Sequence, residues 1–96
     1  MMDFHPEAIA ELDEALAWYE AQQTGLSDAF MECLNATLGR IEVHPGLASR
    51  IDERLHRVLI NRFPYAVIYS REPERIVVLA IAHLHRHPRH QRPQRR

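Results

Sequence analysis

The stretch YAVIYSREPERIVVLAIA, residues 65–82, decides the fold of this chain. Its two halves, 65–70 and 75–82, are rich in β-branched and aromatic residues, and Arg71–Glu74, which contains Pro73, separates them. Apolar runs bounded by a proline-containing turn predict two antiparallel strands. The second run is apolar at nearly every position, so we expect it to lie in the interior of a sheet.

Further strands are expected on the N-terminal side of this stretch. Residues 55–60 predict a strand, joined to the next one by the turn Asn61-Arg62-Phe63-Pro64. Short turns between consecutive strands imply an antiparallel meander. Residues 1–4 are compatible with a brief edge strand, so the expected sheet has three to four antiparallel strands.

The first half of the chain has helical periodicity instead. Pro6 suits the first position of a helix, and apolar residues recur at helical spacing until Gly25. A second helix, capped by Thr24 or Ser27, then runs to the stop signal His44-Pro45-Gly46. The short connection between the two helices implies an antiparallel hairpin.

Helices followed by strands predict a single α+β domain over residues 1–96, with the N-terminal hairpin packed on one face of the sheet. Residues 83–96 are expected to form a basic tail rich in His and Arg. Tyr65 and Tyr69 share strand parity and are interpreted as packing residues. The core between hairpin and sheet is predicted to contain Ile9, Leu12, Leu16, Phe30, Leu34, Leu38, Val67, Tyr69, Val78 and Ala80.

Charge is divided sharply between the two halves of the chain. Residues 1–48 hold nine acids and one base, a net −8, whereas residues 49–96 hold eleven arginines and four acids, a net +7. A GC-rich genome explains the absence of lysine as readily as selection for arginine does, but not this segregation of sign. The basic half predicts an anionic partner, either nucleic acid or acidic protein, since guanidinium groups bind phosphate and carboxylate alike. The candidate arginines on and beside the strands are Arg54, Arg57, Arg62, Arg86 and Arg89.

Catalytic and metal sites receive little support from the residues. His83, His85, His87 and His90 could share a face, but five nearby arginines would repel a cation, so we expect no metal site and no cofactor. No spacing singles out an acid–base pair, and no Gly-rich phosphate loop or CxxC motif occurs, so no catalytic residue is predicted.

The expected cellular location follows from two features that are not found in the sequence. No apolar run reaches the roughly 20 residues that span a bilayer, and residues 1–7 have no secretory pattern. We therefore expect a cytoplasmic protein without a membrane partner. The single cysteine, Cys33, is expected to be a small buried hydrophobe rather than a nucleophile.

Nearly the whole chain resembles the RelE/ParE toxin superfamily of type II toxin–antitoxin systems. The segments that carry the resemblance, in order, are Phe4-His5-Pro6-Glu7-Ala8, Ala17-Trp18-Tyr19-Glu20, Gly25-Leu26, residues 62–69, residues 77–83 and Arg86-His87-Pro88-Arg89. The resemblance implies a toxin neutralised by a cognate antitoxin. It also implies one of two mechanisms, mRNA cleavage in the ribosomal A site by RelE-like members or DNA gyrase inhibition by ParE-like members.

The residues depart from the nuclease pattern of the superfamily. Ala66 stands where the nuclease branch tends to have an arginine, and Leu59 stands where a second basic residue accompanies the one matched by Arg57. Arg86 matches the basic residue after the last strand, but no tyrosine follows Tyr69. Loss of general acid–base assistance typically lowers a rate by about 10² to 10⁴.

The expected function is therefore a ParE-like, non-enzymatic gyrase inhibitor. Its antitoxin is expected to be acidic and partly disordered, and to contact Arg57, Arg62, Arg86 or Arg89. The alternatives are a RelE-like nuclease, whose partners are the ribosome and mRNA, and a decayed toxin that acts only as a binding module.

Overall fold

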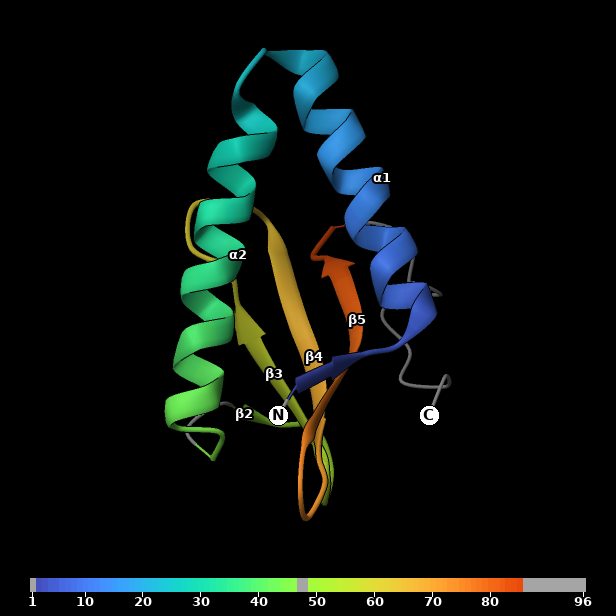
Figure 1. The fold of residues 1–96 in the computed structure, drawn as a ribbon, viewed down its shortest axis with the longest axis vertical. Coiled ribbons are helices and arrows are strands. Elements are labelled where there is room, and N and C mark those ends of the chain that lie inside the picture. Colours follow the sequence, from blue (N-terminus) through green and yellow to red (C-terminus); the bar gives the residue numbers. More distant parts are fainter. Residues whose placement is uncertain (1, 47–48, 86–96) are drawn as a thin grey trace.

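The computed structural model describes residues 2–46 and 49–85 and has two layers, a helical hairpin and a β-sheet (Figure 1). The helices are α1 (Pro6–Gln22) and α2 (Leu26–Val43). The strands are β1 (Met2–Phe4), β2 (Ser49–Arg50), β3 (Leu55–Leu59), β4 (Tyr65–Arg71) and β5 (Ile76–His83). The predicted α+β class, with the hairpin before the sheet, is confirmed.

The sheet has five strands in the order β1-β5-β4-β3-β2. The predicted antiparallel meander of β3, β4 and β5 is confirmed. The expectation of three to four antiparallel strands is wrong in detail, because β1 pairs parallel with β5 and a two-residue β2 adds to β3. Local patterns do not encode the pairing of Met2 with Ile76, and a two-residue strand has no periodicity to detect.

The face of α1 that packs on the sheet differs slightly from the predicted one. Ala8 and Ala15 are fully buried, whereas Ile9 is 47% exposed, so its assignment to the core was wrong. Adjacent helical residues point about 100° apart. The buried face centres on Ala8 and Ala15, which leaves Ile9 at its margin.

The connection between the helices is held by Glu20 rather than by a capping hydroxyl. Gly25 is the N-cap of α2, with a left-handed φ of 96° that favours glycine, so the expected Thr24 or Ser27 cap was wrong. The Glu20 carboxylate accepts hydrogen bonds from Gly25 N–H (3.1 Å), Ser27 N–H (3.2 Å) and Ser27 Oγ (2.7 Å). These bonds, that from Ser27 Oγ above all, lower the pKa of Glu20 from its ordinary 4.5.

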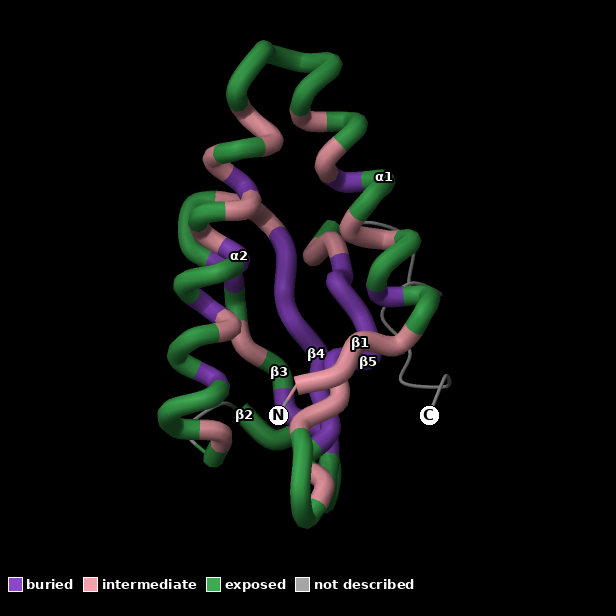
Figure 2. The backbone as a smooth tube through the Cα atoms, in the orientation of Figure 1, coloured by how far each residue is buried: buried purple, intermediate pink, exposed green. Residues whose placement is uncertain are grey.

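One core lies between the hairpin and the sheet. Phe30 and Leu34 of α2 pack there with Val67, Tyr69 and Val78, and all five are at most 1% exposed. Tyr65 lies in the same cluster, which confirms the packing role of the two tyrosines. Leu12, Leu16, Leu38 and Cys33 are half-buried against this core. Figure 2 shows burial concentrated along β4 and β5, with the tip of the hairpin exposed.

A bulge in β5 changes which residues face the helices. Tyr69 pairs with Val78 but Ile68 pairs with Ala80, so Leu79 has no partner in β4. The strand therefore changes phase at Leu79. Ala80 is buried, but in a second cluster with Ile68 and Ala82, so its assignment to the core under the hairpin was wrong.

The outer edge of β5 is covered by two different elements. β1 covers its first half and ends with His5 N–H donating to the carbonyl of Val78 (2.8 Å). Beyond that point the carboxylate of Glu11, from α1, accepts a hydrogen bond from Ile81 N–H (2.9 Å). Glu11 thus satisfies a strand donor that β1 is too short to reach.

Candidate partner-binding surface

The sheet face turned away from the helices is built from small side chains. Register and alternation place Ala66, Ile68, Ala80 and Ala82 on this face, and each is at most 3% exposed. Arg57 of β3 lies opposite Ile68 and so belongs to the same face. No ionisable side chain comes from the β4 and β5 positions named here, so this part of the face has no group for acid–base chemistry.

The predicted site arginines do not all lie together. Arg57 is exposed on the face turned away from the helices, whereas Arg62 is exposed in the turn between β3 and β4. Arg86 and Arg89 lie outside the described residues. Exposed Leu59, at 53%, lies between the two described arginines in sequence.

A groove of about 380 Å³ runs between α2 and the edge of β3. Arg62 and Leu59 line it from the sheet side, and Arg40 lines it from the last turn of α2. Arg40 donates a hydrogen bond to Oγ1 of buried Thr37 (3.3 Å), which holds its guanidinium at the groove. Arg57, Leu59, Arg62 and Arg40 together form what we term the basic edge. Arg40 was not predicted, because it is the one base of the acidic half of the chain.

Arg62 has a backbone conformation that side chains rarely adopt. Its φ is 74°, the one positive φ of a non-glycine residue among residues 2–46 and 49–85. Its guanidinium carbon lies 5.7 Å from the centre of the Phe63 ring, which packs in turn on Tyr19 and Phe30. A left-handed non-glycine residue costs about 1–3 kcal/mol and is often found at a functional site. This turn therefore holds an arginine where glycine would be less strained.

The histidines at the end of β5 have a packing role. His83 was expected to begin the basic tail, but it is the last residue of β5 and its ring lies 5.0 Å from that of Tyr65. His85 donates its backbone N–H to Nδ1 of His83 (3.0 Å). The described part of the chain contains no group of three side chains that could hold a metal ion. None of its helices is long and apolar enough to cross a membrane.

A helical hairpin on a mixed sheet, with a basic edge and a face of small residues, defines a small α+β protein. A family model for the ParE toxin of the type II toxin–antitoxin system parDE matches residues 2–88. The chain belongs to this family, and as such it is a toxin whose partner is a cognate antitoxin.

A solved structure supports the fold independently. The chromosomal ParDE toxin–antitoxin system from P. aeruginosa contains a chain that is 15% identical to this one, with a TM-score of 0.61 over 83% of this chain and 90% of that chain. This likeness concerns the fold alone. No curated protein matches the chain in sequence.

Proposed function

We propose that this toxin inhibits DNA gyrase without cutting nucleic acid. The observation that carries the proposal is the face turned away from the helices, where Ala66 stands at the position of an expected nuclease arginine and Ala80 and Ala82 surround it. An oxyanion-stabilising or proton-transferring group at such a site is what ribonuclease chemistry requires. Membership of the ParE family supports the same choice of mechanism.

A direct experiment separates the proposed target from the ribosome. The purified toxin is added to gyrase and relaxed plasmid, and we expect supercoiling to be lost in proportion to toxin concentration. Primer extension on translated mRNA from induced cells should show no new cleavage. Codon-phased cleavage would establish the RelE-like alternative instead, and absence of both effects would identify a decayed toxin that only binds its antitoxin.

We further propose that an acidic segment of the antitoxin binds the basic edge. Arg40 and Arg62 line the groove together with Leu59, and Arg57 lies two residues before Leu59 on the same strand face. A charged rim beside an apolar anchor suits an acidic chain with one apolar side chain to insert. The strained backbone of Arg62 supports this choice. Arg86 and Arg89 are proposed to contact the antitoxin as well.

Binding kinetics test the roles of charge and anchor separately. Stopped-flow association of toxin and antitoxin should slow with rising salt, and Arg57→Glu/Arg62→Glu should lower the association rate because complementary charge steers encounter. Leu59→Ala should mainly raise the dissociation rate, by about tenfold, since apolar anchors carry most of the affinity. The matched control is Arg50→Glu/Arg54→Glu, which makes the same change in net charge away from the basic edge. If both double variants lowered the association rate equally, net charge alone would account for the steering.

A further inference from the structure

A second group of arginines lines a cleft apart from the basic edge. The cleft has a volume of about 800 Å³ and lies where β3 begins and β4 ends. Its lining residues are Gly46, Arg50, Glu53, Arg54, His56, Arg71, Glu72 and Pro73. Arg50 is opposite His56 in the sheet, and Arg71 donates its backbone N–H to the carbonyl of Arg54 (3.1 Å). The guanidinium groups therefore come to one hollow from β2, from the residue before β3 and from the end of β4.

Arg54 and Arg71 form a like-charge pair across neighbouring strands. They continue the register that places Leu55 opposite Ser70, so they lie directly opposite each other. Like charges in this position destabilise a sheet. A like-charge pair of this kind is an expected property of an anion site, because a bound anion relieves the repulsion.

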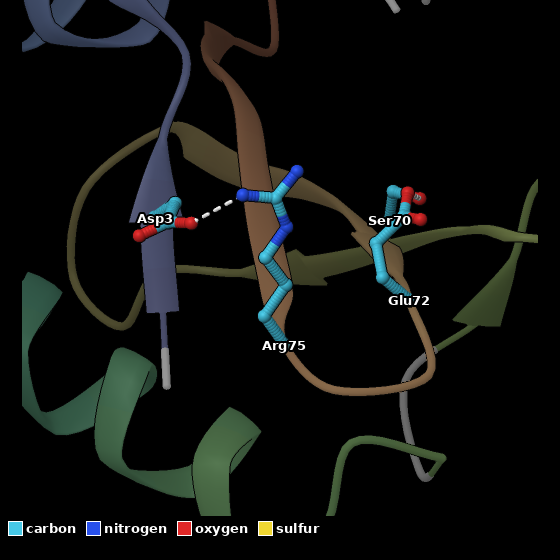
Figure 3. Close-up of polar contacts among 4 residues, drawn as sticks. All are labelled: Asp3, Ser70, Glu72 and Arg75. Carbon is cyan, nitrogen blue, oxygen red and sulfur yellow. Dashed lines mark hydrogen bonds and ion pairs between the residues drawn. The ribbon is translucent and has the colours of Figure 1, made fainter.

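The carboxylate beside Arg54 is that of Asp52, which accepts hydrogen bonds from the backbone N–H groups of Arg54 and Leu55 (3.0 Å each). Arg75, at the far end of the turn between β4 and β5, forms an ion pair with Asp3 of β1 (2.7 Å; Figure 3). Arg50 donates instead to the backbone carbonyls of Asp52 and Glu53. Glu72 accepts a hydrogen bond from Oγ of Ser70 (2.9 Å).

The wall of the cleft is rigid and partly buried. His56 is 3% exposed and stacks on Tyr69, with ring centres 5.2 Å apart. The hydroxyl of Tyr69 donates to the carbonyl of Pro45 (2.6 Å), which fixes the loop after α2 against the sheet. Arg71 lies close against Gly46, since a Cβ at that glycine would be 3.1 Å from Nη1 of Arg71. Packing thus holds the floor of the cleft at His56, whereas the three arginines that line it are exposed.

We propose that this cleft binds a phosphoryl dianion, either as free phosphate or as the phosphate of a nucleoside monophosphate. Guanidinium groups match phosphate oxygens in geometry and charge, and three of them suit one compact anion. Glu53 and Glu72 in the lining repel every anion, and they disfavour an extended polyanion, which would pass both carboxylates, more than one compact anion held between the guanidinium groups. The volume is in the range of small-molecule sites, about 300–1,000 Å³.

Calorimetric titration of the full chain with inorganic phosphate, at ionic strength matched with chloride, tests the proposal. Arg54→Gln and Arg71→Gln should each weaken binding about tenfold or more, the loss expected for one hydrogen bond to a charged group. Arg75→Gln, which removes the same charge from the far end of the turn between β4 and β5, outside the cleft lining, should bind phosphate like the wild type. Absence of phosphate binding, or equal loss in Arg75→Gln, would overturn the proposal.

Two further measurements complete the test. Titration with adenosine monophosphate separates the sources: tighter binding than phosphate identifies a nucleotide, and equal binding identifies free phosphate. A decaglutamate peptide that binds as tightly as phosphate and is equally sensitive to Arg54→Gln would overturn the proposal in favour of protein carboxylates. In thermal unfolding, phosphate should raise the midpoint of the wild type more than that of Arg54→Gln. If phosphate raised the unfolding midpoints of both proteins equally, phosphate binding at this cleft would also be contradicted.

Discussion

The two faces of the sheet differ in the size of their side chains. The face under the hairpin carries Tyr69, Val67 and Ile81, and it packs against Phe30 and Leu34 of α2. The face turned away from the helices carries alanines and one isoleucine along β4 and β5, with Arg57 and Leu59 exposed at its edge. Large side chains that bury much apolar area place the stability of the fold on one face. On the other face Ala66, Ile68, Ala80 and Ala82 are at most 3% exposed, so the side chains available to a partner are those of Arg57 and Leu59 at its edge.

The same leucine truncation on the two faces should give the largest contrast. Leu34→Ala removes a side chain that is 1% exposed and should destabilise the protein by about 2–5 kcal/mol, through lost transfer energy and a cavity. Leu59→Ala, at a position 53% exposed, should stay within about 0.5 kcal/mol. Urea unfolding of both variants measures the difference. Similar losses would mean that the two faces contribute equally to stability.

A smaller loss of stability is expected at the edge of β5, where Glu11 of α1 joins the helical layer to the sheet. Glu11→Ala leaves the N–H of Ile81 without its acceptor, which should cost about 1–3 kcal/mol. Glu11→Gln keeps a side-chain oxygen at the same distance and should retain most of the stability. If both variants lose the same amount, the charge of Glu11 matters rather than its hydrogen bond.

A still smaller loss of stability is expected at Tyr69, where the core meets the loop after α2. Tyr69→Phe preserves the ring on His56 but removes the hydrogen bond to Pro45, at a net cost of about 0.5–1.5 kcal/mol.

Burial raises the pKa of the Tyr69 hydroxyl above 10.0, and the charge of Arg71 partly opposes this. The contribution of Tyr69 is therefore fully present below pH 10 and is lost as the pH rises through the raised pKa. Chemical unfolding should show that the difference in free energy of unfolding between wild type and Tyr69→Phe is smaller above pH 10 than at pH 7. A difference that stays constant with pH would contradict a stabilising role for the protonated Tyr69 hydroxyl.

The smallest effect is expected at the exposed tip of the hairpin. Because the fold lowers the pKa of Glu20 below 4.5, its contribution is present above pH 4.5 and is lost as the pH falls through the lowered value. The thermal midpoint of Glu20→Gln should thus lie slightly below that of the wild type at neutral pH, and the two should converge in acid. Ser27→Ala, which removes the strongest of the three bonds, should reproduce part of the difference. Midpoints that remain separate in acid would exclude the carboxylate as the cause.

Much of the candidate site could be predicted from charge, but its assembly could not. Arg57 and Arg62 were predicted because they lie in a half of the chain with a net charge of +7. Arg40 was missed because it joins them only through the packing of α2 beside β3. The positive φ of Arg62 has no signal in the residues Asn61-Arg62-Phe63-Pro64. A backbone strain of this kind depends on the surrounding structure that imposes it.

By itself, the sequence determined the two helices, the meander of three strands and the core position of Leu34, because helical and strand periodicity and turn residues act locally. Only the tertiary structure decided that β1 pairs parallel with β5, that β5 changes phase at Leu79 and that Arg54 faces Arg71. Each of these features is a register between segments that are distant in sequence or a one-residue shift within a strand. A one-residue shift moves every later side chain to the other face, and local preferences are nearly equal for the two registers when both faces are apolar.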